Sequence, residues 1–151
     1  MVIEFSCSIE AKINITHAIQ CIPLNEIDEL SILFVCIDNS DARRLVMENY
    51  KDFEIIVISE FVVPRDWDNE DHWKKRYFNF LILHEVAHAL HKHKSPKKLN
   101  LEQNKKQEDD ADSTAMLWLN SYFGSKSMNL YYEDELKLSQ DKIKFDRSSY
   151  L

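Results

Sequence analysis

The sequence predicts an α+β protein in which a small mixed β-sheet packs against a helical half of the chain. Two observations lead to this fold class. Apolar, β-branched segments lie before residue 64, whereas long helical patterns fill most of the chain after it. The single glycine and three prolines leave few tight turns. With 151 residues and no break in composition, we expect one domain over residues 1–151.

The segments before residue 64 predict three strands and one helix. In the first strand, at residues 2–15, apolar and polar residues alternate from Ile9 to Ile15. The other two strands, at residues 31–38 and 53–63, are continuous apolar runs that fit buried positions in a sheet. Between them, a run of capping residues predicts a helix at residues 41–50.

The rest of the chain predicts three helices, at residues 70–94, 102–123 and 133–143. The first has no internal Gly or Pro, and Ser95-Pro96 follows it. One face of this helix, at spacings of three and four, carries aromatic residues and then two histidines: Trp73, Tyr77, Phe80, His84 and His88.

Composition also limits the partners and the compartment. A formal net charge of −7 disfavours nucleic acid or an anionic membrane as the main partner. The three cysteines, Cys7, Cys21 and Cys36, are odd in number and never form C-x-x-C, which is typical of a reduced cytoplasmic protein. No leader-like segment opens the chain, and no apolar run approaches the length of a membrane span.

The residues from His84 to His88 spell H-E-x-x-H. On a helix, two histidines four residues apart lie on one face, so both imidazoles can bind the same zinc ion. Glu85 points to a different side and can act as general base on a zinc-bound water. The pattern therefore predicts a zinc-dependent peptidase.

A hydrolytic zinc usually keeps three protein ligands, so one more is required. The metzincin pattern needs Gly and His at positions 91 and 94, but His91 and Lys94 stand there. A carboxylate from the next helix is the alternative, and Glu108 is the best candidate, although spacing alone does not separate it from Asp109 or Asp110. Asp112 lies one turn beyond Glu108 and could accept a hydrogen bond from a zinc-bound imidazole.

Other readings of these residues are simpler. The acidic run from residue 108 to 112 could be a solvated helical turn, and His91 and His93 are expected to be solvated at a helix end. An oxyanion-stabilising group is also required, and Tyr77, His91, His93 and Tyr122 remain alternatives.

Two motifs together resemble a known family. The first is Arg76-x-x-x-Phe80-x-x-x-His84-Glu85-x-x-His88, and the second is Glu108-x-x-Ala111-Asp112-x-x-Ala115. Across residues 53–120 they are similar to the ImmA/IrrE zinc metallopeptidases and the related minigluzincins. The chain departs from that pattern at Ala87, where Gly is usual, and at Thr114, where Phe is common.

The resemblance implies a zincin-like fold and Glu108 as the third zinc ligand. It also implies that the strand at residues 53–63 is a sheet edge that binds an extended peptide, a geometry that backbone hydrogen bonds allow. The substrate would be an intracellular protein, often a transcriptional regulator in that family. The alternative hypothesis is a zinc-stabilised module that is catalytically silent or latent and serves regulation or protein binding.

Overall fold

A computed structural model of the chain describes residues 2–37, 43–45, 53–65 and 73–123. It confirms the α+β class. The elements in chain order are β1 (Val2–Ser6), α1 (Ile9–Ile19), α2 (Leu24–Ile27), β2 (Ser31–Ile37), β3 (Arg43–Leu45), β4 (Glu54–Ser59), the 3-10 turn η1 (Glu60–Val62), α3 (Trp73–Leu90), the 3-10 turn η2 (Pro96–Lys98) and α4 (Leu101–Phe123). The helix predicted at residues 133–143 lies outside the described residues.

The four strands form one mixed sheet in the order β1-β2-β4-β3. β1, β2 and β4 run parallel, whereas β3 pairs antiparallel with β4. The register sets Phe5 opposite Phe34, whose rings stack with their centroids 5.9 Å apart, and Phe34 opposite Ile56. β4 is therefore an interior strand, and the expectation that it forms a sheet edge is wrong because β3 pairs with its outer side.

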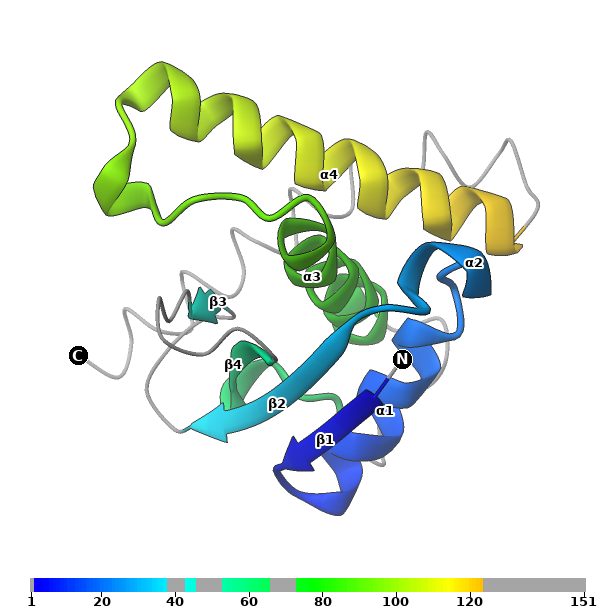
Figure 1. Ribbon diagram of the computed structural model, residues 1–151. Helices are drawn as coiled ribbons and strands as arrows, with labels where there is room; N and C mark the ends of the chain where they lie inside the picture. The colour runs from blue at the N-terminus through cyan, green and yellow to red at the C-terminus, as the bar shows by residue number, and fades with distance from the viewer. Residues whose placement is uncertain (1, 38–42, 46–52, 66–72, 124–151) are drawn as a thin grey trace.

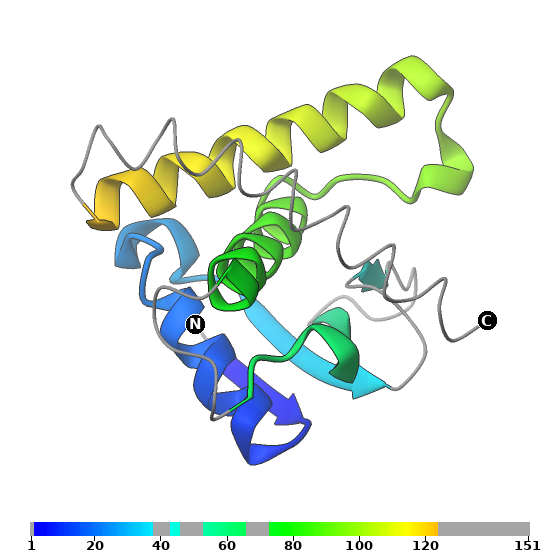
Figure 2. The same cartoon turned by 180° about the vertical axis from the view of Figure 1, so that it is seen from behind.

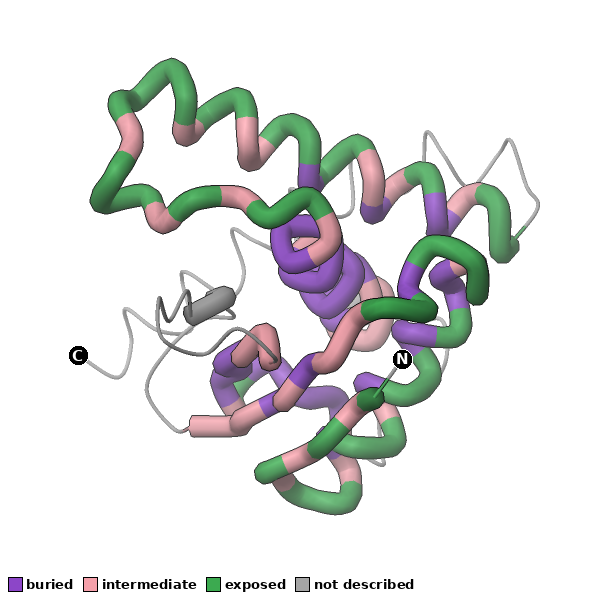
Figure 3. Tube along the Cα trace, viewed as in Figure 1, coloured by how far each residue is buried: buried purple, intermediate pink, exposed green. Residues whose placement is uncertain are grey.

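Helices α1 and α3 cover the same face of the sheet, and α4 lies across α3 on the side away from the sheet (Figures 1 and 2). α3 is consequently the central helix, between the sheet and α4. Figure 3 shows it buried along most of its length, whereas the outer side of α4 is exposed. The core between these layers includes Phe34, Phe78, Ile82 and Trp118, each no more than 1% exposed.

The prediction of one strand over residues 2–15 is half wrong, since α1 begins at Ile9. Ser8 caps this helix by accepting a hydrogen bond from the Ala11 amide at 3.2 Å. Ala11 and Ile15 are fully buried one helical turn apart, whereas Ile9 and Ile13 are exposed. The apparent alternation is therefore two helical faces, because residues four apart lie on one side of a helix.

Three other predicted boundaries change. Residues 43–45 form a strand, not part of a helix at residues 41–50, and the other residues of that segment are not described. The strand at residues 53–63 ends at Ser59 and continues as the turn η1. α3 ends at Leu90, before residue 94, while α4 spans nearly the predicted range of 102–123. None of the described helices is long and apolar enough to cross a membrane.

Candidate metal site

The H-E-x-x-H motif lies in the C-terminal half of α3, where four of its five residues are buried. Tyr77 and Phe80 are 8% and 7% exposed, which confirms that the face leading to the histidines is packed. Trp73 opens the helix, but its side chain is not among those described. The rings of Phe80 and His84 lie 5.9 Å apart, so the aromatic face leads directly to the first histidine.

Helix α4 places the Glu108 carboxylate beside His84 and His88. Ala111 and Ala115 are fully buried on it, and such small residues permit a close approach of two helices. His84 Nε2 lies 3.3 Å from Glu108 Oε2, and His88 Nε2 lies 3.4 Å from Glu108 Oε1. The two imidazole Nε2 atoms are 3.0 Å apart. We call these three residues, His84, His88 and Glu108, the His–Glu cluster.

The His–Glu cluster could hold a metal ion. Its three ligand atoms lie within 4.8 Å of one another, and it is the one such group of three found among the described residues. Tetrahedral zinc with bonds of 2.0–2.2 Å separates two ligand atoms by about 3.4 Å. The observed distances of 3.0, 3.3 and 3.4 Å are close to that separation. Two imidazoles and a carboxylate also form a donor set that suits zinc.

The three candidate carboxylates occupy different positions. Glu108 lies against both imidazoles, with a side chain 45% exposed. Asp110 lies farther out, 61% exposed, with Oδ2 3.9 Å from Nε2 of His93. Asp109 is exposed and is not part of the cluster. Helix geometry separates the three residues, because consecutive positions on a helix point about 100° apart.

The charges in the cluster stabilise one another in the absence of a metal. Hydrogen bonds from His84 and His88 hold the pKa of Glu108 well below its usual range. Burial disfavours the charged form of His84, but hydrogen bonds to Asp112 and Glu108 outweigh it and raise the pKa of His84 to about 9. The metal-free cluster is therefore an ion pair near neutral pH.

Asp112 and Glu85 complete the predicted set. Asp112 Oδ1 lies 2.8 Å from His84 Nδ1, so this carboxylate accepts the Nδ1–H and leaves Nε2 facing the cluster. The Asp112 side chain is 53% exposed, and the contact therefore lies at the rim of the site. Glu85 is only 6% exposed, and its negative charge contributes to the raised pKa of His84.

The expectation that both His91 and His93 are solvated is wrong for His93, whose side chain is only 9% exposed, whereas His91 is exposed as expected. His93 Nδ1 lies 2.7 Å from His88 Nδ1, and His91 Nε2 lies 3.0 Å from the Thr114 hydroxyl. The sequence signal for His93 was its position five residues after His88, just past a helix end. This spacing brings His93 to His88 only if the helix ends at Leu90 and the chain then reverses direction.

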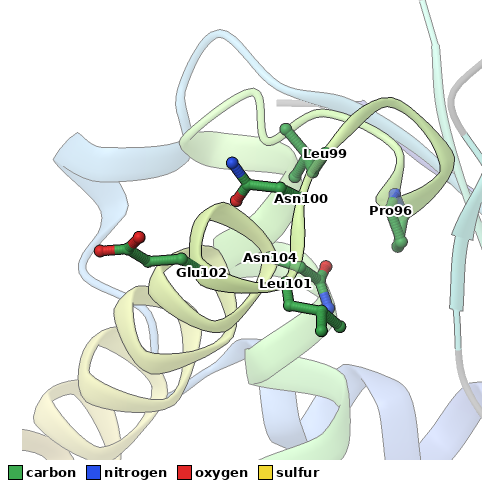
Figure 4. Close-up of a pocket in the computed structure, with 6 residues that line it drawn as sticks. All are labelled: Pro96, Leu99, Asn100, Leu101, Glu102 and Asn104. Atoms are coloured by element: carbon green, nitrogen blue, oxygen red, sulfur yellow. The ribbon is translucent and has the colours of Figure 1, made fainter.

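A separate hollow lies at the start of α4 (Figure 4). Its volume is about 730 Å³, and the residues that line it are Pro96, Leu99, Asn100, Leu101, Glu102 and Asn104. None of these residues belongs to the cluster. Leu101 is 91% exposed beside it, so the hollow is an open surface feature. The hollow therefore contributes no residue to the candidate metal site, which consists of the His–Glu cluster.

Comparison with known protein families gives a match to a peptidase family. The family model described as Peptidase U49 matches residues 77–140, which include α3 from Tyr77 onward and the whole of α4. No curated protein and no solved structure matches the chain. The matched segment contains every member of the His–Glu cluster, together with Glu85 and Asp112. The chain is thus similar to a peptidase family over the segment that carries its candidate site, and this similarity supports a peptidase function.

Proposed function

We propose that the chain is a zinc-dependent endopeptidase, with His84, His88 and Glu108 as the metal ligands. The observation that carries the proposal is the position of the Glu108 carboxylate, with one oxygen 3.3 Å from His84 Nε2 and the other 3.4 Å from His88 Nε2. The two Nε2 atoms are 3.0 Å apart, and these separations are close to those between the ligands of tetrahedral zinc. The match to a peptidase family over the same two helices supports hydrolysis as the use of the metal. The resemblance to the ImmA/IrrE family favours the same type of enzyme.

In this proposal a bound zinc ion supplies Lewis-acid activation of water and of the scissile carbonyl. Glu85 acts as the general base, taking a proton from the attacking water and delivering it to the departing amine as the C–N bond breaks. Its low exposure suits this role, because a buried carboxylate is protected from bulk water. Asp112 holds His84 in the tautomer that directs Nε2 inward.

An extended protein or peptide is the proposed substrate. Among the described strands, the two sheet edges are β1 and β3. β3 is the edge next to β4, so strand addition would take place there and not on β4 as the resemblance implied. By that resemblance, a cytoplasmic transcriptional regulator is the candidate partner.

The decisive experiment compares wild type with Glu85→Gln and with Glu29→Gln, a matched control at an exposed site. Each is incubated with a broad peptide library, with and without chelator, and its zinc content is measured. We expect chelator-sensitive cleavage by wild type and Glu29→Gln. Glu85→Gln should retain zinc but lose cleavage by about 10²–10⁴-fold.

Cleavage by Glu85→Gln at the wild-type rate would remove Glu85 from the mechanism. Zinc-dependent melting without any cleavage by wild type would instead favour a silent or latent module. The ligand assignment has its own pair of variants: Glu108→Ala should sharply weaken zinc binding, whereas Asp109→Ala, one residue away, should not. Equal zinc affinity in both variants would transfer the ligand role to another carboxylate.

A further inference from the structure

The C-terminal end of α3 turns back on itself immediately after the motif. Lys92 has a positive φ of 52°, in the left-handed region. Its amide donates to the Ala89 carbonyl at 3.2 Å, and the His93 amide donates to the His88 carbonyl at 3.1 Å. These two bonds form a Schellman motif, in which the second residue after the helix returns over the residue five positions earlier. The turn therefore brings His93 to His88.

The two side chains meet at their ring nitrogens. His88 Nδ1 and His93 Nδ1 are 2.7 Å apart, and the rings cross at 74° with centroids 4.9 Å apart. In Schellman motifs an apolar contact frequently joins these two positions. Here a hydrogen bond replaces it, and such a bond requires one N–H donor and one bare nitrogen acceptor. The side chain of His93 is only 9% exposed, so water has little access to the contact.

Which of the two rings donates this hydrogen bond follows from the role of Nε2, the other ring nitrogen of His88. Nε2 faces Glu108 and Nε2 of His84 inside the His–Glu cluster. If Nε2 is to offer its lone pair to a metal, the ring must carry its proton on Nδ1. His88 then donates through Nδ1–H, and His93 accepts through a bare Nδ1.

We infer that His93 is a positioning residue that fixes the orientation and tautomer of His88 for metal binding. The inference rests on the proposed zinc site. It gives the two histidine ligands different supports, since Asp112 on α4 accepts from His84 at 2.8 Å, whereas His93 reaches His88 from the turn that ends α3 itself. A neutral imidazole acceptor also adds no negative charge to a site that already contains Glu85 and Glu108.

His93 is itself held in place from two sides. The His91 ring stacks on it, with centroids 5.3 Å apart and planes inclined by 23°, and His91 is tied to α4 through Thr114. Nε2 of His93 points toward Asp110 Oδ2 at 3.9 Å, which is too long for a hydrogen bond but orients the N–H toward a carboxylate. The H-K-H sequence at residues 91–93 thus forms a support for His88.

The test measures zinc affinity by competition with a chromophoric chelator, and the melting temperature of each metal-free protein. His93→Phe keeps a ring against His88 but removes the acceptor. His93→Asn restores an acceptor, because its side-chain oxygen stands near the position of Nδ1. His17→Phe, on the exposed side of α1, is the matched control.

We expect His93→Phe to weaken zinc binding by about 10–100-fold, the usual effect of losing such a support. The metal-free melting temperature should fall only slightly, from the loss of one hydrogen bond, and the protein should remain folded at the assay temperature, so that unfolding does not explain the loss of zinc affinity. His93→Asn should recover most of the affinity, and His17→Phe should match wild type. Wild-type affinity in His93→Phe would overturn the inference alone. Absence of zinc binding by wild type itself would overturn the proposed function, and this inference with it.

A second measurement needs no variant and therefore does not depend on how His93→Phe folds. In the zinc-loaded wild type with ¹⁵N-labelled histidine, a nitrogen–nitrogen coupling across the hydrogen bond should link His88 Nδ1 to His93 Nδ1. A slowly exchanging Nδ1–H proton on His88 should accompany it. Absence of that coupling would show that the two rings are not hydrogen-bonded, and would overturn the inference.

Discussion

The pH dependence of zinc binding can be calculated from the environment of His84. Hydrogen bonds to Asp112 and Glu108 outweigh the opposing effect of burial and raise the pKa of His84 to about 9. Near pH 7 the metal-free protein therefore carries a proton on His84. Zinc must displace that proton before it can bind, so its affinity depends on pH.

The size of the effect follows from the distance between the pKa and the working pH. At pH 7, two pH units below a pKa of about 9, roughly one molecule in a hundred has a neutral His84, and removing the proton costs about 3 kcal/mol. The His84 side chain is only 12% exposed, so solvent screens little of this interaction. The neutral fraction of His84 rises from about one in a hundred at pH 7 to one half at pH 9, so zinc affinity should rise about 50-fold between these pH values.

Calorimetry in buffers of different ionisation enthalpy would count the protons released, and chelator competition would give the affinity. We expect close to one proton per zinc at pH 7. In Asp112→Asn the pKa of His84 should fall, so that the affinity changes less between pH 7 and pH 9, whereas Asp109→Asn should behave as wild type. An affinity that stays flat in wild type, after correction for zinc hydrolysis and chelator protonation, would refute the reasoning.

Three further predictions concern stability, each read from denaturant unfolding with chelator present. The pKa of His84 is raised from 6.5 to about 9, so protonated His84 should add fully to the free energy of unfolding below pH 6.5, and this stabilisation should be lost as the pH rises through 9. A free energy of unfolding that does not change over this pH range would contradict the prediction. Ala115→Leu should cost about 1–3 kcal/mol by forcing α4 away from α3, with the exposed Ser113→Leu as control. Ser8→Ala should cost about 1 kcal/mol by removing the cap of α1, and an unchanged midpoint would deny the cap a role.

Long segments with a clear period were predictable from the sequence. The helix that carries the motif and the helix after it appear close to the predicted positions, because each presents an apolar face over several turns. The strand at residues 31–37 was equally clear as a short apolar run. In such segments the local pattern and the burial imposed by the fold agree.

Short segments were less predictable, for a physical reason. From Ile9 to Ile15, an alternating pattern of seven residues satisfies both a strand and a helix, since positions four apart share a face in either structure. The Ser8 cap and the burial of Ala18 and Ile19 in the next turn favour the helix. β3 is only three residues long, so its pairing with β4, and not its own propensity, defines it as a strand.

The sequence by itself determined the chemistry of α3. With 3.6 residues per turn, any α-helix sets His84 and His88 on one face and directs Glu85 to another side, whatever surrounds them. It also identified Glu108 and Asp112 as candidates, but it could not choose among neighbouring carboxylates. Nor could it show that His93 reaches His88.

The tertiary structure determines which carboxylate lies beside the two histidines and which residue contacts His88. Glu108 lies beside His84 and His88 because α4 crosses α3 at the buried alanines of α4. His93 lies beside His88 because α3 ends at Leu90 and the chain reverses at Lys92. Contacts between elements depend on where each helix ends and on how the side chains between them pack. Periodicity along the chain records neither, so only the folded arrangement brings these side chains together.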